Sequence, residues 1–305
     1  MNKNFGRVVV FGGAGFIGRH LVDGLLDCSR EVVLFDLLEP INTHQNIKFF
    51  KGNLLDEKAV EAAVDGADAV FDFAGMADID ECQEKRIDAV KTNVLGTTTL
   101  LEACAKANVS RFVFASSLYV YSRVGGIYRA TKIASEELIE EYSNIFDLPY
   151  IILRFGTIYG PNADNRNSVH RYVSQALERG IIEFPGDGQE MREYIHVLDA
   201  VHQTIELTKE DTVNQKYLIT GNHPTRASGL FELIGEVIGR KIEVKYDPDA
   251  AGHGSHYHVS PYAHRNQRAL KVNNPRFIDL GQGILELVDH LSSQGKDFSG
   301  HPWSR

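Results

Sequence analysis

The sequence is poor in cysteine and has no long apolar run. Its 305 residues include three cysteines, Cys28, Cys82 and Cys104, an odd number without Cys-x-x-Cys spacing. Neither a disulfide framework nor a zinc site is therefore expected, and a reducing cytoplasm is the expected location. No segment reaches the roughly 18 apolar residues that a membrane span needs, and the start of the chain is short and polar, so secretion and membrane insertion are not expected.

Basic residues are also in the minority. The chain has 32 Lys and Arg against 41 Asp and Glu, a formal net charge of -9. A nucleic-acid surface needs clustered basic residues, so nucleic acid is not an expected partner, and a phosphate-bearing ligand would be bound by a few local cations. The length allows one large domain or two modest ones.

The first apolar runs have the pattern of a βαβ unit. Val8–Phe11 predicts a strand that ends in glycines, Ile17–Leu26 an amphipathic helix, and Glu31–Asp36 a second strand that ends in an acid. The alternation then continues, with strands predicted at 47–51, 69–73, 111–115 and 150–154 and helices at 56–64, 88–107 and 128–146. Alternating strands and helices predict a Rossmann-type α/β fold, a doubly wound parallel sheet covered on both faces.

After Gly156 the alternation is less regular, which predicts a second part of the chain. Residues 1–155 are expected to form a dinucleotide-binding domain, to which 198–221 return. Residues 156–197 and 222–305 are expected to form a smaller α/β lobe that binds substrate. This lobe has predicted helices at 169–179, 229–238 and 284–292, strands at 194–197 and 241–246, and a long loop at 247–265.

The glycine-rich turn after the first strand predicts a dinucleotide site. In the pattern Gly12-x-x-Gly15-x-x-Gly18 the glycines permit a tight turn, close backbone approach to a pyrophosphate, and packing of the following helix, whose N-terminus faces the phosphates. Asp36 ends the next strand, where a carboxylate accepts hydrogen bonds from the adenosine ribose and repels a 2′-phosphate. NAD is therefore the expected cofactor rather than NADP.

Tyr128 and Lys132 are the strongest candidates for chemistry. Their four-residue spacing places both side chains on one face of a helix. A nearby ammonium lowers the pKa of a tyrosine from about 10 toward working pH, so such a pair can transfer a proton while a nicotinamide transfers a hydride.

These motifs, taken together, resemble the extended short-chain dehydrogenase/reductase family, in particular its nucleotide-sugar epimerase and dehydratase branch. The resemblance covers nearly the whole chain. The matching segments are Gly-Gly-Ala-Gly-Phe-Ile-Gly at 12–18, Gly-Asn-Leu at 52–54, Phe-Ala-Gly at 73–75, Asn93 in Asn-Val-Leu-Gly-Thr, Ala-Ser-Ser at 115–117, Tyr128-x-x-x-Lys132, Tyr-Gly-Pro at 159–161 and Arg-Glu-Tyr-Ile-His-Val-Leu-Asp at 192–199.

The resemblance implies a role for each matching residue. Ser117, Tyr128 and Lys132 would be the catalytic trio, and Arg192 would contact the sugar-nucleotide diphosphate. Thr157 stands where the family often has asparagine, and Arg166 is a further candidate ligand of the diphosphate. The implied cofactor contacts are Gly12, Gly15, Phe16, Ile17, Gly18, Asp36, Asn53, Leu54, Phe73, Ala74, Gly75, Asn93, Ala115, Tyr128 and Lys132.

The residues after Ser117 narrow the reaction. The family resemblance implies Thr-Asp-Glu at this place in dehydratases and Thr-Ser-Glu in decarboxylases. This chain has Leu118 and Tyr119 after Ser117 and thus lacks the carboxylates. Epimerisation at C3 or C5 would call for a second acid or base such as cysteine, and none of the three cysteines is near the motif. What remains is redox chemistry at one carbon, and the resemblance favours C4 epimerisation of a UDP-hexose. A 4-keto-sugar reductase or a sugar dehydrogenase is the alternative within enzymes, and a dinucleotide-sensing regulatory protein is the alternative outside them.

Two further expectations concern partners. The histidines of segment 253–264, including His256 and His258, could suggest a metal, but no acidic or cysteine partner has suitable spacing, so no metal site is expected. The resemblance also implies a homodimer, because the predicted helices 88–107 and 128–146 resemble the pair through which family members form a four-helix bundle. Only six residues separate Tyr121 from Tyr128, fewer than the family usually has, so the sugar pocket is expected to be more open or closed by another segment.

Overall fold

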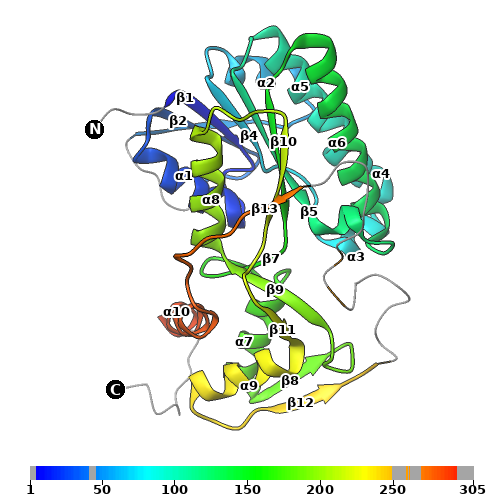
Figure 1. The fold of residues 1–305 in the computed structure, drawn as a ribbon, viewed down its shortest axis with the longest axis vertical. Helices are drawn as coiled ribbons and strands as arrows, with labels where there is room; N and C mark the ends of the chain where they lie inside the picture. The colour runs from blue at the N-terminus through cyan, green and yellow to red at the C-terminus, as the bar shows by residue number, and fades with distance from the viewer. Residues whose placement is uncertain (1–4, 41–45, 249–258, 260, 262–268, 294–305) are drawn as a thin grey trace. The chain divides into compact units, whose positions relative to one another are not determined.

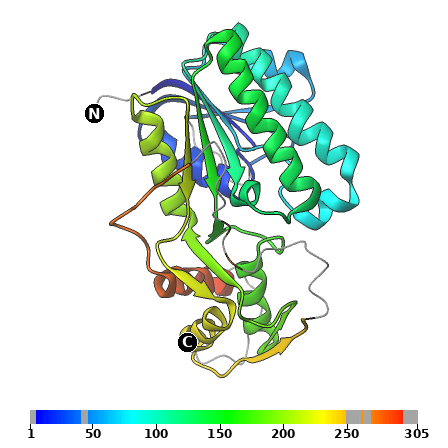
Figure 2. The same ribbon diagram turned by 45° about the vertical axis from the view of Figure 1, so that its right-hand side comes forward.

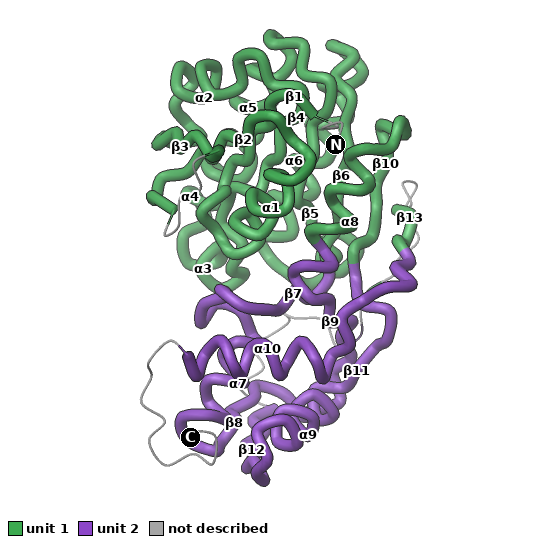
Figure 3. Tube along the Cα trace, turned by 90° about the vertical axis from the view of Figure 1, so that its left-hand side faces the viewer, with its two compact units in different colours: residues 1–155, 201–219, 261–272 green, residues 156–200, 220–260, 273–305 purple. Residues whose placement is uncertain are grey.

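The computed structural model describes residues 5–40, 46–248, 259, 261 and 269–293. The chain divides into two compact units (Figure 3). Unit 1 consists of Met1–Phe155, Val201–Ile219 and Pro261–Val272; unit 2 consists of Gly156–Ala200, Thr220–Ser260 and Asn273–Arg305.

Unit 1 is built on an eight-stranded sheet with the order β13-β10-β6-β5-β4-β1-β2-β3 (Figure 1). Every neighbouring pair is parallel. The strands are β1 Phe5–Phe11, β2 Ser29–Asp36, β3 Ile47–Lys51, β4 Ala69–Asp72, β5 Arg111–Ser117, β6 Tyr150–Phe155, β10 Gln215–Ile219 and β13 Leu270–Lys271. The predicted doubly wound parallel sheet is confirmed. Its central strands are apolar runs, as expected where helices cover both faces.

Helices α1 (Phe16–Leu26) and α8 (Val197–Lys209) cover one face of this sheet, and α2 (Glu57–Val64), α5 (Gly96–Lys106) and α6 (Gly126–Phe146) cover the other (Figures 1 and 2). The second face carries a continuous core that includes Phe11, Phe112 and Leu100.

The predicted helix at 88–107 is confirmed, but a π-helical turn interrupts its α-helical geometry. The structure has α3 (Ile79–Glu84), α4 (Arg86–Val90), a π-helical turn η1 (Lys91–Leu95) and then α5. The π turn contains Asn93, which is buried, and such turns often occur at functional sites. Hydrophobic periodicity could not reveal this interruption, because one additional residue in a helical turn changes the spacing of the apolar side chains only slightly.

Unit 2 has its own small sheets and core. Strands β7 (Thr157–Tyr159), β9 (Met191–His196) and β11 (Pro224–Arg226) form one sheet, and β8 (Ile181–Phe184) pairs with β12 (Glu243–Tyr246). Helices α7 (Ser168–Arg179), α9 (Ala227–Ile238) and α10 (Leu280–Ser293) complete the unit. Val173, Phe231, Ile234 and Leu287 lie in its core.

Across the described ranges, none of the helices combines the length and apolar character that crossing a bilayer requires. The histidines of segment 253–264, at which no metal site is expected, lie outside the described residues, as do residues 295–305.

Candidate functional site

The candidate site of unit 1 lies at the carboxyl edge of its parallel sheet. Phe11 of β1 is aligned with Asp72 of β4, and Asp72 with Phe114 of β5. The segments that follow these strands therefore begin next to one another, at the edge where open α/β sheets bind ligands. They contain the glycine turn, the segment 73–75 and Ser117.

The glycine turn leaves no room for side chains at two of its positions. Gly12 has a φ of 75°, and a Cβ on it would lie 2.5 Å from the backbone oxygen of Phe73. A Cβ on Gly18 would overlap the backbone oxygen of Gly12. Gly15 caps helix α1 without a side chain, so no side chain occupies the first N–H groups of the helix. This bare backbone beside a helix N-terminus fits the pyrophosphate of a dinucleotide.

Asp36 is tied to the glycine turn. Its carboxylate accepts hydrogen bonds from the backbone N–H of Ala14 at 3.0 Å and of Leu38 at 3.0 Å. These contacts hold the end of β2 beside the turn, where an adenosine ribose would lie. Phe16 and Ile17 form the first turn of α1.

Asn53 and Leu54 follow β3. The Asn53 side chain accepts a hydrogen bond from the backbone N–H of Leu55 at 2.9 Å, and Leu54 is buried in the core. Their expected contacts with the cofactor stay predictions, as do those of the other residues assigned from the resemblance.

Asn93 anchors the segment after β4. Its Oδ1 accepts from the backbone N–H of Met76 at 2.7 Å, and its Nδ2 donates to the Met76 oxygen at 2.9 Å and to Thr131 Oγ1 at 3.1 Å. The amide therefore links segment 73–76 to helix α6. Through these contacts Asn93 fixes the segment that follows β4 at the candidate site.

Ser117, Tyr128 and Lys132 occupy the end of β5 and the start of α6. Ser117 caps a 3₁₀ turn, η2 (Leu118–Tyr121), and its Oγ accepts from the backbone N–H of Tyr119 at 3.3 Å. The Lys132 ammonium donates to the Ala115 oxygen at 2.7 Å and lies 6.0 Å from the centre of the Tyr128 ring. A serine hydroxyl used as an acceptor can still donate its own proton to a ligand oxygen.

Burial sets the charges around Lys132. It lowers the pKa of the ammonium below its usual 10.5, while Asp72, Cys82 and Glu136 act in the opposite direction. Asp72 is fully buried, and burial raises its pKa from 3.8 to about 6, although Lys132 and a hydrogen bond from Thr97 lower it. A buried carboxylate thus helps to keep the ammonium charged.

The expectation that no cysteine lies near the catalytic motif is wrong for Cys82. Far from Tyr128 in the sequence, it nevertheless packs in the same buried cluster, because α3 lies against α6. It is fully buried, and burial raises its thiol pKa to about 11. A thiol with that pKa is a poor base at neutral pH, so the argument against a cysteine acid or base holds for this reason rather than for distance.

The expected substrate ligands lie in unit 2. Thr157 is on β7, which pairs with β9, and Arg192 is on β9, half-buried, with one N–H donating to the Met191 oxygen at 2.9 Å. Arg166 has a side chain that is 71% exposed and is paired with Asp164 at 2.6 Å. An exposed arginine so close in sequence to its partner is a weaker candidate than Arg192.

Several residues that sequence reasoning did not single out surround the trio. Tyr119 places its ring edge-on to Tyr128, with 6.2 Å between the ring centroids. Asp72 acts electrostatically on Lys132, and Glu136 follows Lys132 by one helical turn. The four-residue spacing of Tyr128, Lys132 and Glu136 was a signal that could have identified Glu136. Within the ranges that the structure describes, no cluster of metal-ligating side chains was found.

The fold and the site together define a class of enzyme, the dinucleotide-dependent oxidoreductase type. The features are the parallel sheet, the glycine turn without side chains and the Ser-Tyr-Lys arrangement. The chain belongs to the NAD dependent epimerase/dehydratase family, whose model matches residues 8–219. It is thus an extended short-chain dehydrogenase/reductase, and its cofactor is NAD, as predicted.

Similar proteins cover most of the chain. An uncharacterized UDP-glucose epimerase of Bacillus subtilis is 28% identical, with 94% of this chain and 98% of the relative covered. A low-salt glycan biosynthesis protein of Haloferax volcanii is 29% identical over 83% of this chain and 89% of its own. The crystal structure of UDP-glucose 4-epimerase from Thermus thermophilus in complex with NAD is 26% identical, with a TM-score of 0.77, and covers 94% of this chain and 99% of that chain.

Proposed function

We propose that the protein is an NAD-dependent nucleotide-sugar 4-epimerase that acts on a UDP-hexose through a transient 4-keto sugar. The observation that carries the proposal is the arrangement of Ser117, Tyr128 and Lys132 at the sheet edge where the glycine turn also begins. Ser117 is followed by Leu118 and Tyr119 rather than by a carboxylate. Dehydration needs an additional acid and base, whereas epimerisation at C4 needs one group that removes and returns a proton. The names of the Bacillus and Thermus relatives support the same reaction.

The side chains divide the work as follows. Tyr128 takes the proton from the 4-hydroxyl and returns it after the 4-keto sugar has rotated to present its other face. Lys132 stabilises the phenolate and holds the nicotinamide ribose, and Ser117 donates a hydrogen bond that aligns the same sugar oxygen. NAD, when bound, accepts the hydride from C4 and gives it back.

Unit 1 is proposed to hold the cofactor and unit 2 the substrate. Gly12, Gly15 and Gly18 would bind the pyrophosphate, and Asp36 the adenosine ribose. Arg192 would contact the diphosphate of the sugar nucleotide, with Thr157 and Arg166 as further ligands. A place in polysaccharide biosynthesis in the cytoplasm fits this substrate class and the free cysteines.

Isotope labelling tests the reaction. Because the hydride leaves and returns on the same carbon, a UDP-hexose deuterated at C4 is expected to give the C4 epimer with the label retained and without net NADH. UDP-, GDP-, dTDP- and ADP-hexoses tested in parallel would identify the nucleotide. Stoichiometric NADH, or a requirement for added NADPH, would instead support the dehydrogenase or the reductase.

A homodimer is the second part of the proposal. Ile87 and Val90 are 72% and 47% exposed on α4, and Leu95 is 54% exposed in the η1 turn that continues it. Exposed apolar side chains gathered on neighbouring helices often mark an interface between subunits. Light scattering is therefore expected to give about twice the 34.0 kDa mass of the chain.

Charged substitutions test which helices form the interface. Ile87→Lys is expected to shift the mass to that of a monomer, because it would bury an ammonium between the subunits. Leu285→Lys is the matched control, since Leu285 is an exposed apolar residue on α10. A wild-type mass near that of one chain at micromolar concentration would contradict the dimer.

A further inference from the structure

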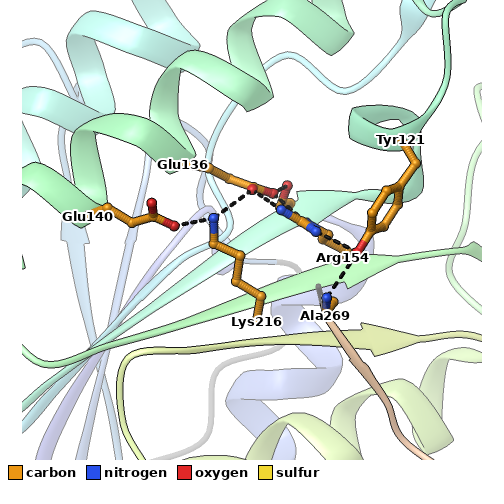
Figure 4. Close-up of polar contacts among 7 residues, drawn as sticks. Tyr121, Glu136, Glu140, Arg154, Lys216 and Ala269 are labelled. Carbon is orange, nitrogen blue, oxygen red and sulfur yellow. Dashed lines mark hydrogen bonds and ion pairs between the residues drawn. The ribbon is translucent and has the colours of Figure 1, made fainter. Parts of the chain in front are cut away.

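A buried group of charged side chains lies beside the trio, between helix α6 and the sheet. Arg154 of β6 donates from Nε to Glu136 Oε1 at 3.0 Å and from Nη2 to Oε2 at 2.5 Å, a forked contact. Lys216 of β10 contacts Glu140 and lies 3.6 Å from the carboxylate of Glu136. Figure 4 shows the guanidinium of Arg154 between the carboxylate of Glu136 and the phenol of Tyr121. This group is called the Glu136 network below.

Stability alone is a poor explanation for the Glu136 network. Glu136, Arg154 and Lys216 are 3%, 4% and 5% exposed, so three charges have left water almost completely. The two cations match the carboxylates of Glu136 and Glu140, but a buried ion pair is often no more stabilising than apolar side chains of the same volume. Its fixed, forked geometry does, however, define positions accurately.

The Glu136 network contacts residues on both sides of Ser117 in the sequence. The hydroxyl of Ser116, the residue before it, donates to Glu136 Oε1 at 2.5 Å. Tyr121, the last residue of the η2 turn that Ser117 begins, accepts from Arg154 Nη1 at 2.6 Å and from the backbone N–H of Ala269 at 3.1 Å. Both ends of the turn are thus bonded to one carboxylate–guanidinium pair.

The same pair is fixed to the helix that carries the other two members of the trio. Glu136 follows Lys132 by four residues, as Lys132 follows Tyr128, so the three side chains share one stripe of α6. Glu136 also acts electrostatically on Lys132, since it raises the pKa of the ammonium against the effect of burial.

We propose that the Glu136 network is a positioning device for the reaction, which holds Ser117 in register with Tyr128 and Lys132 by bonding both ends of the η2 turn to α6. Its members touch neither substrate nor cofactor in this role. The inference rests on the proposed function of the trio, and it adds residues from β5, β6 and β10 that determine the alignment of the trio.

Three substitutions test the proposal. The rate to be measured is that of single-turnover hydride transfer from a UDP-hexose to bound NAD, monitored by nicotinamide absorbance. Ser116→Ala and Tyr121→Phe each remove one hydroxyl that holds the turn and are expected to slow the step about tenfold, and Glu136→Gln about 10²-fold, the cost of a small misplacement of reacting groups. The KM for substrate and the affinity for NAD are each expected to change by less than about threefold. Glu137→Gln, the same substitution at an exposed position of α6, is the matched control.

The pH profile separates positioning from charge. Lys132 is faced by Asp72, Cys82 and Glu136, and Glu136 is faced by Arg154 and Lys216. Loss of the Glu136 charge lowers the pKa of Lys132 further, so the alkaline limb of the rate is expected to move to lower pH in Glu136→Gln. It is expected to stay in place in Ser116→Ala, which removes no charge.

Rates within twofold of wild type in Ser116→Ala and Tyr121→Phe would overturn the proposal, even if Glu136→Gln failed to fold. So would losses confined to KM or to thermal stability. If the wild-type protein transfers hydride but releases a keto sugar, epimerisation is refuted. The hydride-transfer rates of the variants would then still test the positioning proposal. A wild-type protein that transfers no hydride from any sugar nucleotide to NAD would overturn both the epimerase proposal and the positioning proposal.

Discussion

Replacement of Tyr128 by phenylalanine is expected to lower turnover by about 10²-fold or more while the protein still folds and binds NAD. The ring of Tyr128 packs with Cys82 and Ala89, and phenylalanine preserves that packing. Only the hydroxyl is lost, and with it the group proposed to move the proton of the sugar hydroxyl, which accounts for the size of the effect. Steady-state kinetics, thermal denaturation and NAD titration would measure the three quantities.

Tyr150→Phe is the matched control for this substitution. Tyr150 is a buried tyrosine at the start of β6, the opposite end of the strand from the candidate site, so its loss of a hydroxyl should leave turnover unchanged. If Tyr128→Phe kept more than a tenth of the wild-type turnover, another group would have to carry the proton.

Lys132→Met is expected to lower the rate by a similar factor and, unlike Tyr128→Phe, to weaken NAD binding as well. The ammonium is proposed to serve both the phenolate and the nicotinamide ribose, so its loss affects chemistry and binding together. Lys106→Met is the control, because Lys106 is an exposed lysine of α5. A variant with weakened NAD binding and unchanged turnover at saturating NAD would remove Lys132 from the chemistry.

The same variant has an expected pH signature in stability. The folded-state pKa of Asp72, about 6, lies above its usual 3.8, so the folded protein holds this proton more tightly than the unfolded chain. The contribution of Asp72 to stability is therefore full below pH 3.8 and is lost as the pH rises through about 6. Without Lys132 the pKa of Asp72 rises further, so the loss should extend to higher pH, which denaturation across a pH series would reveal.

The sequence allowed the main fold to be predicted because its signals are local. The run Val8–Phe11, the glycines after it and the acid at Asp36 lie within one βαβ unit, and each has one clear structural meaning. Short strands such as β7, β8 and β11 were not predicted, since three or four residues show no reliable periodicity. Their pairing depends on contacts within unit 2.

The candidate site divides in the same way. Tyr128 and Lys132 were recognisable from their spacing, and the structure places both beside the carboxyl edge of the sheet. Glu136, Arg154 and Lys216 read as ordinary charged residues in the sequence, because nothing local shows that three distant segments will bury them against one another. The roles of the predicted ligands in unit 2 stay predictions.

The place of Lys216 in the chain has a consequence for the order in which the protein forms. Strands β1 to β6 leave the ribosome first, but β10, which carries Lys216, follows only after residues 156–200 have been made. Until then Glu136 and Glu140 lack the ammonium that contacts them in the finished sheet. Unit 1 thus stays incomplete on the ribosome while much of unit 2 is being translated, so the two units cannot finish folding strictly one after the other.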